Sequence, residues 1–137
     1  MTKSETRADF TKMISQLLVY IIPEAERLGV LVYVKEVERH PCAQLKYKMD
    51  GKAWTLKSMH LNGLAVDLVV ISLDSRHALW RHEIFDLAGA FWISIGGEWG
   101  GEDHWIEKKH EDRPHFQYNK KRREIYLKEL RDARKKT

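Results

Sequence analysis

The first hydrophobic pattern along the chain has the spacing of an amphipathic helix. Its apolar residues recur three or four positions apart, as Phe10, Ile14, Leu17, Leu18, Ile21, Ala25 and Leu28. A helix with such a stripe buries it against a core and leaves the opposite face in water. Pro23 indicates a kink or a restart, and Gly29 is typical of a helix stop. We therefore predict a helix near the N-terminus.

Two later segments have the composition of strands. Val30 to Val37 is short and rich in β-branched residues, and Pro41 follows in a segment that breaks the pattern. Leu64 to Ile71 is a second apolar run, but it carries Asp67 in its middle. Both faces of this strand would be apolar, so the carboxylate has apolar neighbours on every side. An aspartate in such surroundings needs a cation, a cluster of hydrogen-bond donors or a metal ion.

A second helical stripe follows, and it consists of Trp80, Ile84, Leu87, Ala88, Phe91, Trp92 and Ile95. We predict that this helix is capped near Asp74 or Ser75 and that its aromatic residues belong to the core. Glycines mark its end and open a polar, histidine-rich loop that reaches Pro114. Beyond the loop, His115 to Tyr118 has the pattern of a short strand, and Asn119 can cap a final helix.

The composition indicates one soluble domain. A chain of 137 residues is large enough to bury a core without disulfides. Cys42 is the only cysteine, which excludes an intramolecular disulfide and fits a reducing compartment. No uncharged apolar run reaches the roughly 18 residues of a membrane span, and Met1 to Asp9 lacks the plan of a signal peptide. We therefore expect synthesis as a soluble cytosolic protein.

The positive charge of the chain is concentrated at its C-terminus. The formal net charge is +4. Residues 119–137 contain nine Lys or Arg and three Asp or Glu, a local charge of +6 that leaves −2 for residues 1–118. This basic tail can bind anionic partners, although a solvated helix is the usual fate of such a charge run.

Two histidines and a carboxylate can come together around Asp67. In an extended chain His60 would lie about 23 Å from Asp67, at roughly 3.3 Å per residue, but Asn62-Gly63 is a strong turn signal that folds it back. His115 begins another short strand, with Asp112 three residues before it. Two histidines, one carboxylate and an open fourth position make a hydrolytic zinc site, with Asp112 left as general base.

Composition and spacing leave other interpretations open. The chain has five further histidines, which are His40, His77, His82, His104 and His110. A histidine and an aspartate at arbitrary spacing are usually a surface residue and a satisfied polar group. A basic protein with His, Asn and Trp in one loop is also compatible with a nuclease or nucleic-acid-binding module whose tail meets phosphates. That alternative leaves the aspartate in the apolar strand unexplained.

The same residues carry a resemblance to a known family. Ser58-x-His60-x-x-Gly63-x-Ala65-x-Asp67 resembles the S-x-H-x-x-G-x-A-x-D motif of zinc peptidases related to D-alanyl-D-alanine carboxypeptidases. Asp112-x-Pro114-His115-Phe116 resembles the D-x-P-H-F segment of their L-alanyl-D-glutamate endopeptidase branch, which includes phage endolysins.

Two weaker elements complete the resemblance. Trp99-Gly100-Gly101 is similar to the W-G-G that precedes the second motif in the family. Arg39 with Gln44 is similar to an R-S-x-x-x-Q element, although His40 stands where Ser or Thr is usual. The elements follow the family order over roughly residues 30–118. The loop of residues 101–112 is longer than usual for the family, and from the sequence we expect no separate wall-binding domain.

The resemblance implies a role for each matching residue. It implies one zinc ion per chain on His60, Asp67 and His115, a catalytic carboxylate at Asp112, and substrate contacts from Arg39 and Ser58, with Arg39 also assisting catalysis. We expect an α+β fold in which a small antiparallel sheet carries the zinc site and packs against helices, with N- and C-terminal helices. Residues 1–137 would form one zinc peptidase domain, with a catalytic core at about 30–118 and a basic C-terminal helix at 119–137.

The resemblance also implies a substrate. Asp112 stands where carboxypeptidase branches have Glu, so we expect an L-alanyl-D-glutamate endopeptidase that acts on bacterial peptidoglycan as a phage-type endolysin. A D-alanyl-D-alanine carboxypeptidase is the alternative within the family. We expect a monomer that binds no nucleic acid and whose basic tail can contact an anionic wall or outer-membrane surface. Without a signal peptide it would wait in the host cytoplasm and reach the wall through a membrane lesion.

Overall fold

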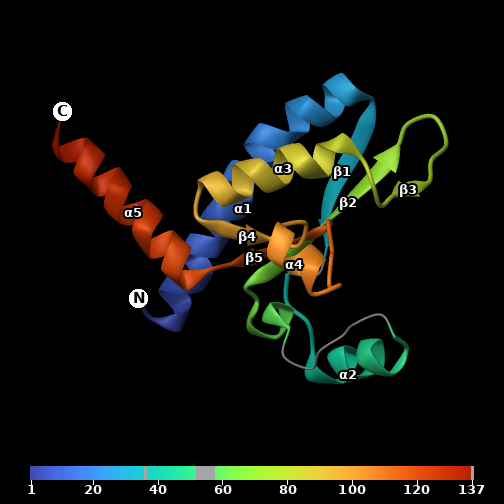
Figure 1. The fold of residues 1–137 in the computed structure, drawn as a ribbon, viewed down its shortest axis with the longest axis horizontal. Helices are drawn as coiled ribbons and strands as arrows, with labels where there is room; N and C mark the ends of the chain where they lie inside the picture. Colours follow the sequence, from blue (N-terminus) through green and yellow to red (C-terminus); the bar gives the residue numbers. More distant parts are fainter. Residues whose placement is uncertain (36, 52–57, 137) are drawn as a thin grey trace.

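The chain folds as helices packed against a small antiparallel sheet (Figure 1). The computed structural model describes residues 1–35, 37–51 and 58–136. The helices are α1 (Lys3–Leu28), α2 (Pro41–Met49), α3 (Glu83–Ser94), α4 (Asp103–Glu107) and α5 (Lys120–Lys135), with a 3₁₀ turn, η1, at Met59–Asn62. The strands are β1 (Val30–Lys35), β2 (Ala65–Ser72), β3 (Ala78–Leu79), β4 (Gly97–Trp99) and β5 (His115–Tyr118). This arrangement confirms the predicted α+β fold.

The sheet has two faces with different tasks. Its order is β1-β2-β5-β4 with antiparallel neighbours throughout, and β3 pairs with the far end of β2. Val66 pairs with Phe116 and Asp67 with His115, and successive side chains along a strand point to opposite faces. Val66 and Phe116 are 1% and 0% exposed, whereas Asp67 and His115 line a cleft. One face therefore builds the core and the other carries the polar residues.

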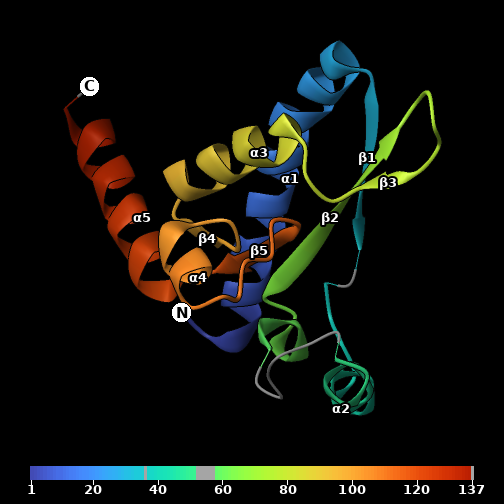
Figure 2. The same cartoon turned by 45° about the vertical axis from the view of Figure 1, so that its right-hand side comes forward.

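Helices α1 and α3 cover the core face of the sheet and lie against each other (Figure 1, Figure 2). Their buried residues are Phe10, Met13, Leu17, Ile21 and Ala25 from α1, and Ile84, Phe85, Ala88, Gly89 and Trp92 from α3. The Trp92 ring contacts Phe10 and Phe116 edge to face, with centroids 5.8 Å and 5.9 Å away. The two predicted apolar stripes thus supply most of the helical side of the core.

Helix α1 is longer than its apolar stripe indicates. Thr2 and Glu5 form a capping box, in which each side chain accepts a hydrogen bond from the other residue's backbone N–H. The helix ends at Gly29, whose φ of 71° lies in the left-handed region, as predicted. Pro23 lies inside this single helix, so the predicted restart is absent. The strand after it is described to Lys35, and Glu36 lies outside the described residues.

The predicted start of the second helix is wrong. Helix α3 begins at Glu83, and its cap is His82, whose Nδ1 accepts a hydrogen bond from the backbone N–H of Ile84 at 3.1 Å. Ser75 instead belongs to the turn between β2 and β3, because its Oγ accepts from the backbone N–H of His77. Trp80 precedes the helix and is 68% exposed. Its helical spacing from the later residues is therefore coincidental.

Short elements also occur where breaks and loops were predicted. Pro41 occupies the first turn of α2, where its missing N–H is no loss, and His40 caps that helix by accepting from the backbone N–H of Cys42. Strand β4 and helix α4 lie within the predicted histidine-rich loop. Each is short, and each is held by contacts from distant segments rather than by its own periodicity.

Helix α5 starts against the body of the protein and then projects from it (Figure 1). Asn119 caps it by accepting from the backbone N–H of Arg122, as predicted. The Arg123 guanidinium is 1% exposed and donates to both carboxylate oxygens of Asp9 at 2.8 Å and 2.9 Å, which anchors α5 to α1. Among the helices of the described residues, none has a length and hydropathy that would let it cross a membrane.

Candidate metal centre

Asp67 is the centre of a three-residue cluster on the cleft face. The carboxylate Oδ1 of Asp67 lies 3.4 Å from His60 Nε2 and 3.6 Å from His115 Nδ1. One donor atom from each residue lies within 4.8 Å of the others, and no other such group of three occurs within the described residues. Asp67 and His115 meet because they are directly paired between β2 and β5, where facing side chains are close.

A local turn brings His60 to the same place. Ser58 Oγ accepts a hydrogen bond from the His60 backbone N–H at 3.2 Å and so begins η1. Gly63 ends η1 with a φ of 67° and donates its N–H to the His60 carbonyl oxygen. The turn predicted at Asn62-Gly63 therefore exists, as a 3₁₀ turn. The His60 ring is 2% exposed and meets the His115 ring edge to face, with centroids 5.2 Å apart.

The donor set fits a catalytic zinc ion. The Nε2 atom of His115 is 2.8 Å from Gln117 Oε1, and because an amide oxygen only accepts, Nε2 carries the hydrogen. The Nδ1 lone pair of His115 is then directed at the cluster, in the way that outer partners orient metal-ligating histidines. Two imidazole nitrogens and one carboxylate oxygen leave a fourth position open, which is the pattern of hydrolytic zinc sites.

The charges within the cluster also favour a cation. Burial would raise the pKa of Asp67, but hydrogen bonding and attraction from His115 and His60 outweigh it and lower the pKa to about 2. Burial would lower the pKa of His115, but hydrogen bonds with Asp67 and Gln117, together with the nearby Asp112, raise it above its usual value. Asp67 thus stays ionised near neutral pH, and its negative charge attracts either a proton on His115 or a metal ion.

Asp112 lies beside the cluster at the end of the long loop. Its backbone N–H donates to the Gly100 carbonyl oxygen at 2.8 Å, and its own carbonyl oxygen accepts from His115 N–H at 3.0 Å. A Cβ at Gly100 would overlap the Asp112 carbonyl oxygen, which explains the glycine. The side chain lines the cleft, where desolvation and the charge of Asp67 outweigh His115 and raise the pKa of Asp112. A carboxylate in this position is a stronger base than one in open water.

Arg39 also lines the cleft and lies close to the cluster. Its guanidinium NH2 is 3.9 Å from Asp67 Oδ2, and its side chain is 9% exposed. NH1 donates to Gln44 Oε1 at 2.6 Å, and the guanidinium carbon lies 4.7 Å from the Tyr47 ring centroid. The structure therefore brings Arg39 together with His60, Asp67 and His115 in one cleft, with Ser58 at its edge.

Comparisons with known proteins agree with this geometry. A family model described as D-alanyl-D-alanine carboxypeptidase matches residues 51–118. The crystal structure of the Serratia marcescens L-Ala D-Glu endopeptidase ChiX is similar, with 31% sequence identity, a TM-score of 0.51, and coverage of 74% of this chain and 77% of that chain. The chain belongs to the D-alanyl-D-alanine carboxypeptidase-like peptidase family. A comparison with curated proteins gives no match.

Membership of this peptidase family explains why the cleft is larger than a site for one metal ion with three protein ligands requires. Peptidases of this family depend on a metal ion, and the cleft of about 860 Å³ leaves room for a peptide beside the cluster. Its walls include Tyr47, Trp80, Glu98 and Trp105, none of which the sequence patterns indicate as site residues. The signal for Glu98 is its place between Gly97 and Trp99, two buried residues on a strand whose middle side chain must point to the other face.

The remaining histidines of this peptidase have other tasks. His40 and His82 cap helices α2 and α3, and His77 lies in the turn before β3. The Nε2 atom of His104 lies 3.1 Å from Glu98 Oε2, and His110 lines the cleft.

Proposed function

We propose that this peptidase carries one zinc ion on His60, Asp67 and His115 and cuts the L-alanyl-D-glutamate bond of peptidoglycan stem peptides. The convergence of two imidazoles and one carboxylate beside Asp112 is the observation that carries the proposal. The endopeptidase named in the similar crystal structure supports the choice of bond, at 31% identity. Asp112, rather than glutamate, three residues before His115 supports the same choice.

The chain supplies the proton transfer for such a reaction. A zinc ion bound there would make hydroxide available near neutral pH and polarise the scissile carbonyl. Asp112 accepts a proton from the attacking water and returns it to the nitrogen of the leaving D-glutamate. The raised pKa of Asp112 suits the first step, because a carboxylate whose acid has a higher pKa is a better proton acceptor.

Arg39 and Ser58 are the proposed substrate contacts. The guanidinium of Arg39 is held by Gln44 and Tyr47, so its planar donors are oriented before a substrate arrives. Its position near Asp67 suits either the oxygen of the scissile carbonyl or a substrate carboxylate. Ser58 Oγ already accepts from His60 N–H, and its own hydroxyl hydrogen remains for a substrate oxygen.

We further propose a phage-type endolysin that acts as a monomer, with residues 1–137 as one peptidase domain and α5 as an anionic-surface contact. Arg122 and Arg123 are engaged by Glu102 and Asp9, so they anchor the helix rather than meet a partner. Exposed basic residues lie at the start of α5, at Lys120 and Lys121, and further along it, at residues such as Arg131 and Lys135. This surface suits wall polymers or the outer membrane, to which the protein would gain access after its release from the host cytoplasm.

Digestion of purified peptidoglycan tests the proposed bond. Mass spectrometry should find new alanine carboxyl ends and glutamate amino ends, with Asp112→Asn as the inactive control. A carboxypeptidase activity is the alternative, because the matching family model is described as D-alanyl-D-alanine carboxypeptidase. Release of free D-alanine alone would assign that activity instead, and cleavage of DNA without cleavage of peptidoglycan would contradict a wall peptidase altogether.

A further inference from the structure

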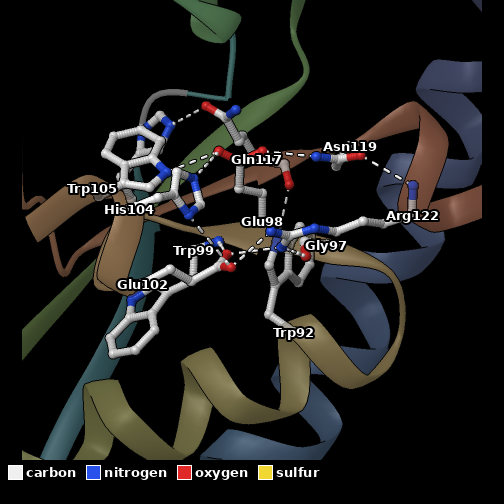
Figure 3. Close-up of polar contacts among 11 residues, drawn as sticks. Trp92, Gly97, Glu98, Trp99, Glu102, His104, Trp105, Gln117, Asn119 and Arg122 are labelled. Atoms are coloured by element: carbon white, nitrogen blue, oxygen red, sulfur yellow. Dashed lines mark hydrogen bonds and ion pairs between the residues drawn. The ribbon is translucent and has the colours of Figure 1, made fainter. Parts of the chain in front are cut away.

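Glu98 is the centre of a hydrogen-bond network outside the proposed metal centre (Figure 3). Its Oε1 accepts from Asn119 Nδ2 at 2.8 Å, and its Oε2 accepts from Trp105 Nε1 at 2.8 Å. His104 Nε2 lies 3.1 Å from the same Oε2. The side chain of Glu98 is 15% exposed, so these partners replace most of its contact with water. A half-buried carboxylate with three partners from two other segments has a role beyond solubility.

The network controls the wall of the cleft next to His115. The Trp105 ring lies 5.2 Å from the His115 ring, centroid to centroid, at an angle of 40°. Trp105 belongs to α4, a helix of five residues whose first turn has no side-chain capping bond among the described residues. So short a helix is not stable by itself. The N-cap residue Glu102 is anchored by Arg122 and by the Trp99 N–H, and the bond from Trp105 to Glu98 holds the indole itself against the cleft.

Glu98 also stands next to the other group that orients His115. In the register of β4 and β5, Glu98 is directly paired with Gln117, which accepts from His115 Nε2–H. The imidazole is thus held at one nitrogen by Gln117 and along one face by Trp105. Both contacts originate at the same cross-strand pair. Loss of either would remove one of the contacts that orient the ring.

We propose that Glu98 is a positioning residue, which holds Trp105 against His115 and so fixes the imidazole in the orientation that binds metal. The inference rests on the proposed metal centre, because it requires His115 to be a ligand. It adds a residue that touches neither metal nor substrate. Its effect reaches the reaction only through Trp105 and His115.

The network needs a carboxylate and not merely a polar residue. Asn119 Oδ1 accepts from the Arg122 backbone N–H, so the amide cannot turn around without loss of the α5 cap. The indole N–H can only donate. Both oxygens of Glu98 must therefore accept, and a glutamine would direct an N–H₂ group at one of these donors. Burial alone would raise the pKa of Glu98, but the hydrogen bonds from Asn119, Trp105 and His104 lower it, which keeps the side chain an acceptor.

A matched set of full-length variants separates this role from simple support of α5. Glu98→Gln replaces one of the two accepting oxygens by a donor, Trp105→Phe keeps a ring but removes the bond to Glu98, and Asn119→Ser keeps a helix cap but removes the other bond. Zinc affinity, measured by competition with a chelator, and the visible spectrum of the cobalt-substituted protein report on His115 directly. Melting temperatures report on the fold.

Glu98→Gln and Trp105→Phe should each lower zinc affinity roughly 3- to 10-fold and change the cobalt spectrum, less than the 10- to 100-fold typical when a direct partner of a ligand is lost. Asn119→Ser should lower only the melting temperature. Wild-type zinc affinity and cobalt spectrum in Trp105→Phe would overturn the proposal, even if Glu98→Gln fails to fold. So would an equal loss in Asn119→Ser. If His115→Ala instead binds zinc as tightly as the wild type, the metal centre itself is wrong.

Discussion

The two faces of the β2–β5 pair differ in composition although they are built from the same eight-residue and four-residue strands. Val66 and Phe116 point into the core, where α1 and α3 seal them from water. Asp67 and His115 are their immediate neighbours in sequence and point into the cleft. Because the strand is pleated, residues that stabilise the core alternate with residues that line the cleft. A shift of the strand register by one residue would exchange the two faces. Val66 and Leu68, which flank Asp67 in sequence, belong to the core cluster.

The core face should respond most strongly to substitution. We expect Phe116→Ala to lower the free energy of unfolding by about 3–5 kcal/mol, because it removes a fully buried ring that packs on Trp92. Denaturant titration measures this loss. Activity per folded molecule should change little at temperatures where the variant remains folded. A large loss of activity in the folded variant would show that the two faces are not independent.

The cleft face should show the reverse behaviour. Asp112→Asn should lower kcat/KM by roughly 100- to 10,000-fold, because the proton acceptor is lost. The free energy of unfolding should stay within about 0.5 kcal/mol of the wild type, as for most substitutions at solvent-accessible positions. Kinetics on a soluble stem peptide and denaturant titration give the two values. Near-normal turnover would transfer the role of base to another group, such as Glu111.

The pH dependence of zinc binding should show a smaller effect, which distinguishes His115 from Asp67. His115 must lose its proton to bind metal, and its pKa is raised, so protons compete with zinc from a higher pH than for an ordinary histidine. The pKa of Asp67 is lowered to about 2, so this carboxylate does not titrate in the same range. Below the pKa of the histidine, the apparent zinc affinity should therefore fall about tenfold for each unit by which the pH is lowered, for every histidine proton that zinc displaces. Chelator competition at several pH values measures the slope, and a flat profile from pH 8 to pH 6 would contradict it.

The smallest expected effect concerns α5, which lies outside both faces. Arg131→Gln with Lys135→Gln should weaken binding to anionic wall preparations a few-fold at low salt and not at high salt, because salt screens exposed charges. Lys3→Gln with Lys12→Gln on α1 removes the same charge elsewhere and is the matched control. Removal of all residues from 119 onward is a poorer test, because it also removes the Arg123–Asp9 contact. Equal losses in both pairs would indicate net charge alone, and no loss in either would favour a solvated helix.

The sequence predicts the cluster of His60, Asp67 and His115 better than it predicts the cleft around it. Asp67 is conspicuous because it interrupts an apolar strand. The turn is predicted by the local residues Asn62 and Gly63. The register of β2 and β5 places His115 opposite Asp67. The sequence spacing alone does not determine this strand pairing. Periodicity also identifies α1 and the buried part of α3, since both present long apolar stripes to one core.

There is a physical reason why the sequence did not predict the residues of the cleft wall. Helices α2 and α4 are only nine and five residues long and have little periodicity of their own. Glu98 gains its partners from α4 and from the residue that caps α5, which no local pattern joins. The wrong start for α3 has the opposite cause, because Trp80 happens to continue a helical spacing beyond the true cap at His82.

The zinc content of single variants tests the central claim most directly. The wild type should bind one zinc ion per chain, and His60→Ala, Asp67→Ala and His115→Ala should each lose most of it after dialysis against dilute chelator. His77→Ala, which removes an exposed histidine from a turn, should keep it. Metal analysis of the folded proteins decides the matter. Full zinc occupancy in His60→Ala or His115→Ala would contradict the assignment of the metal centre.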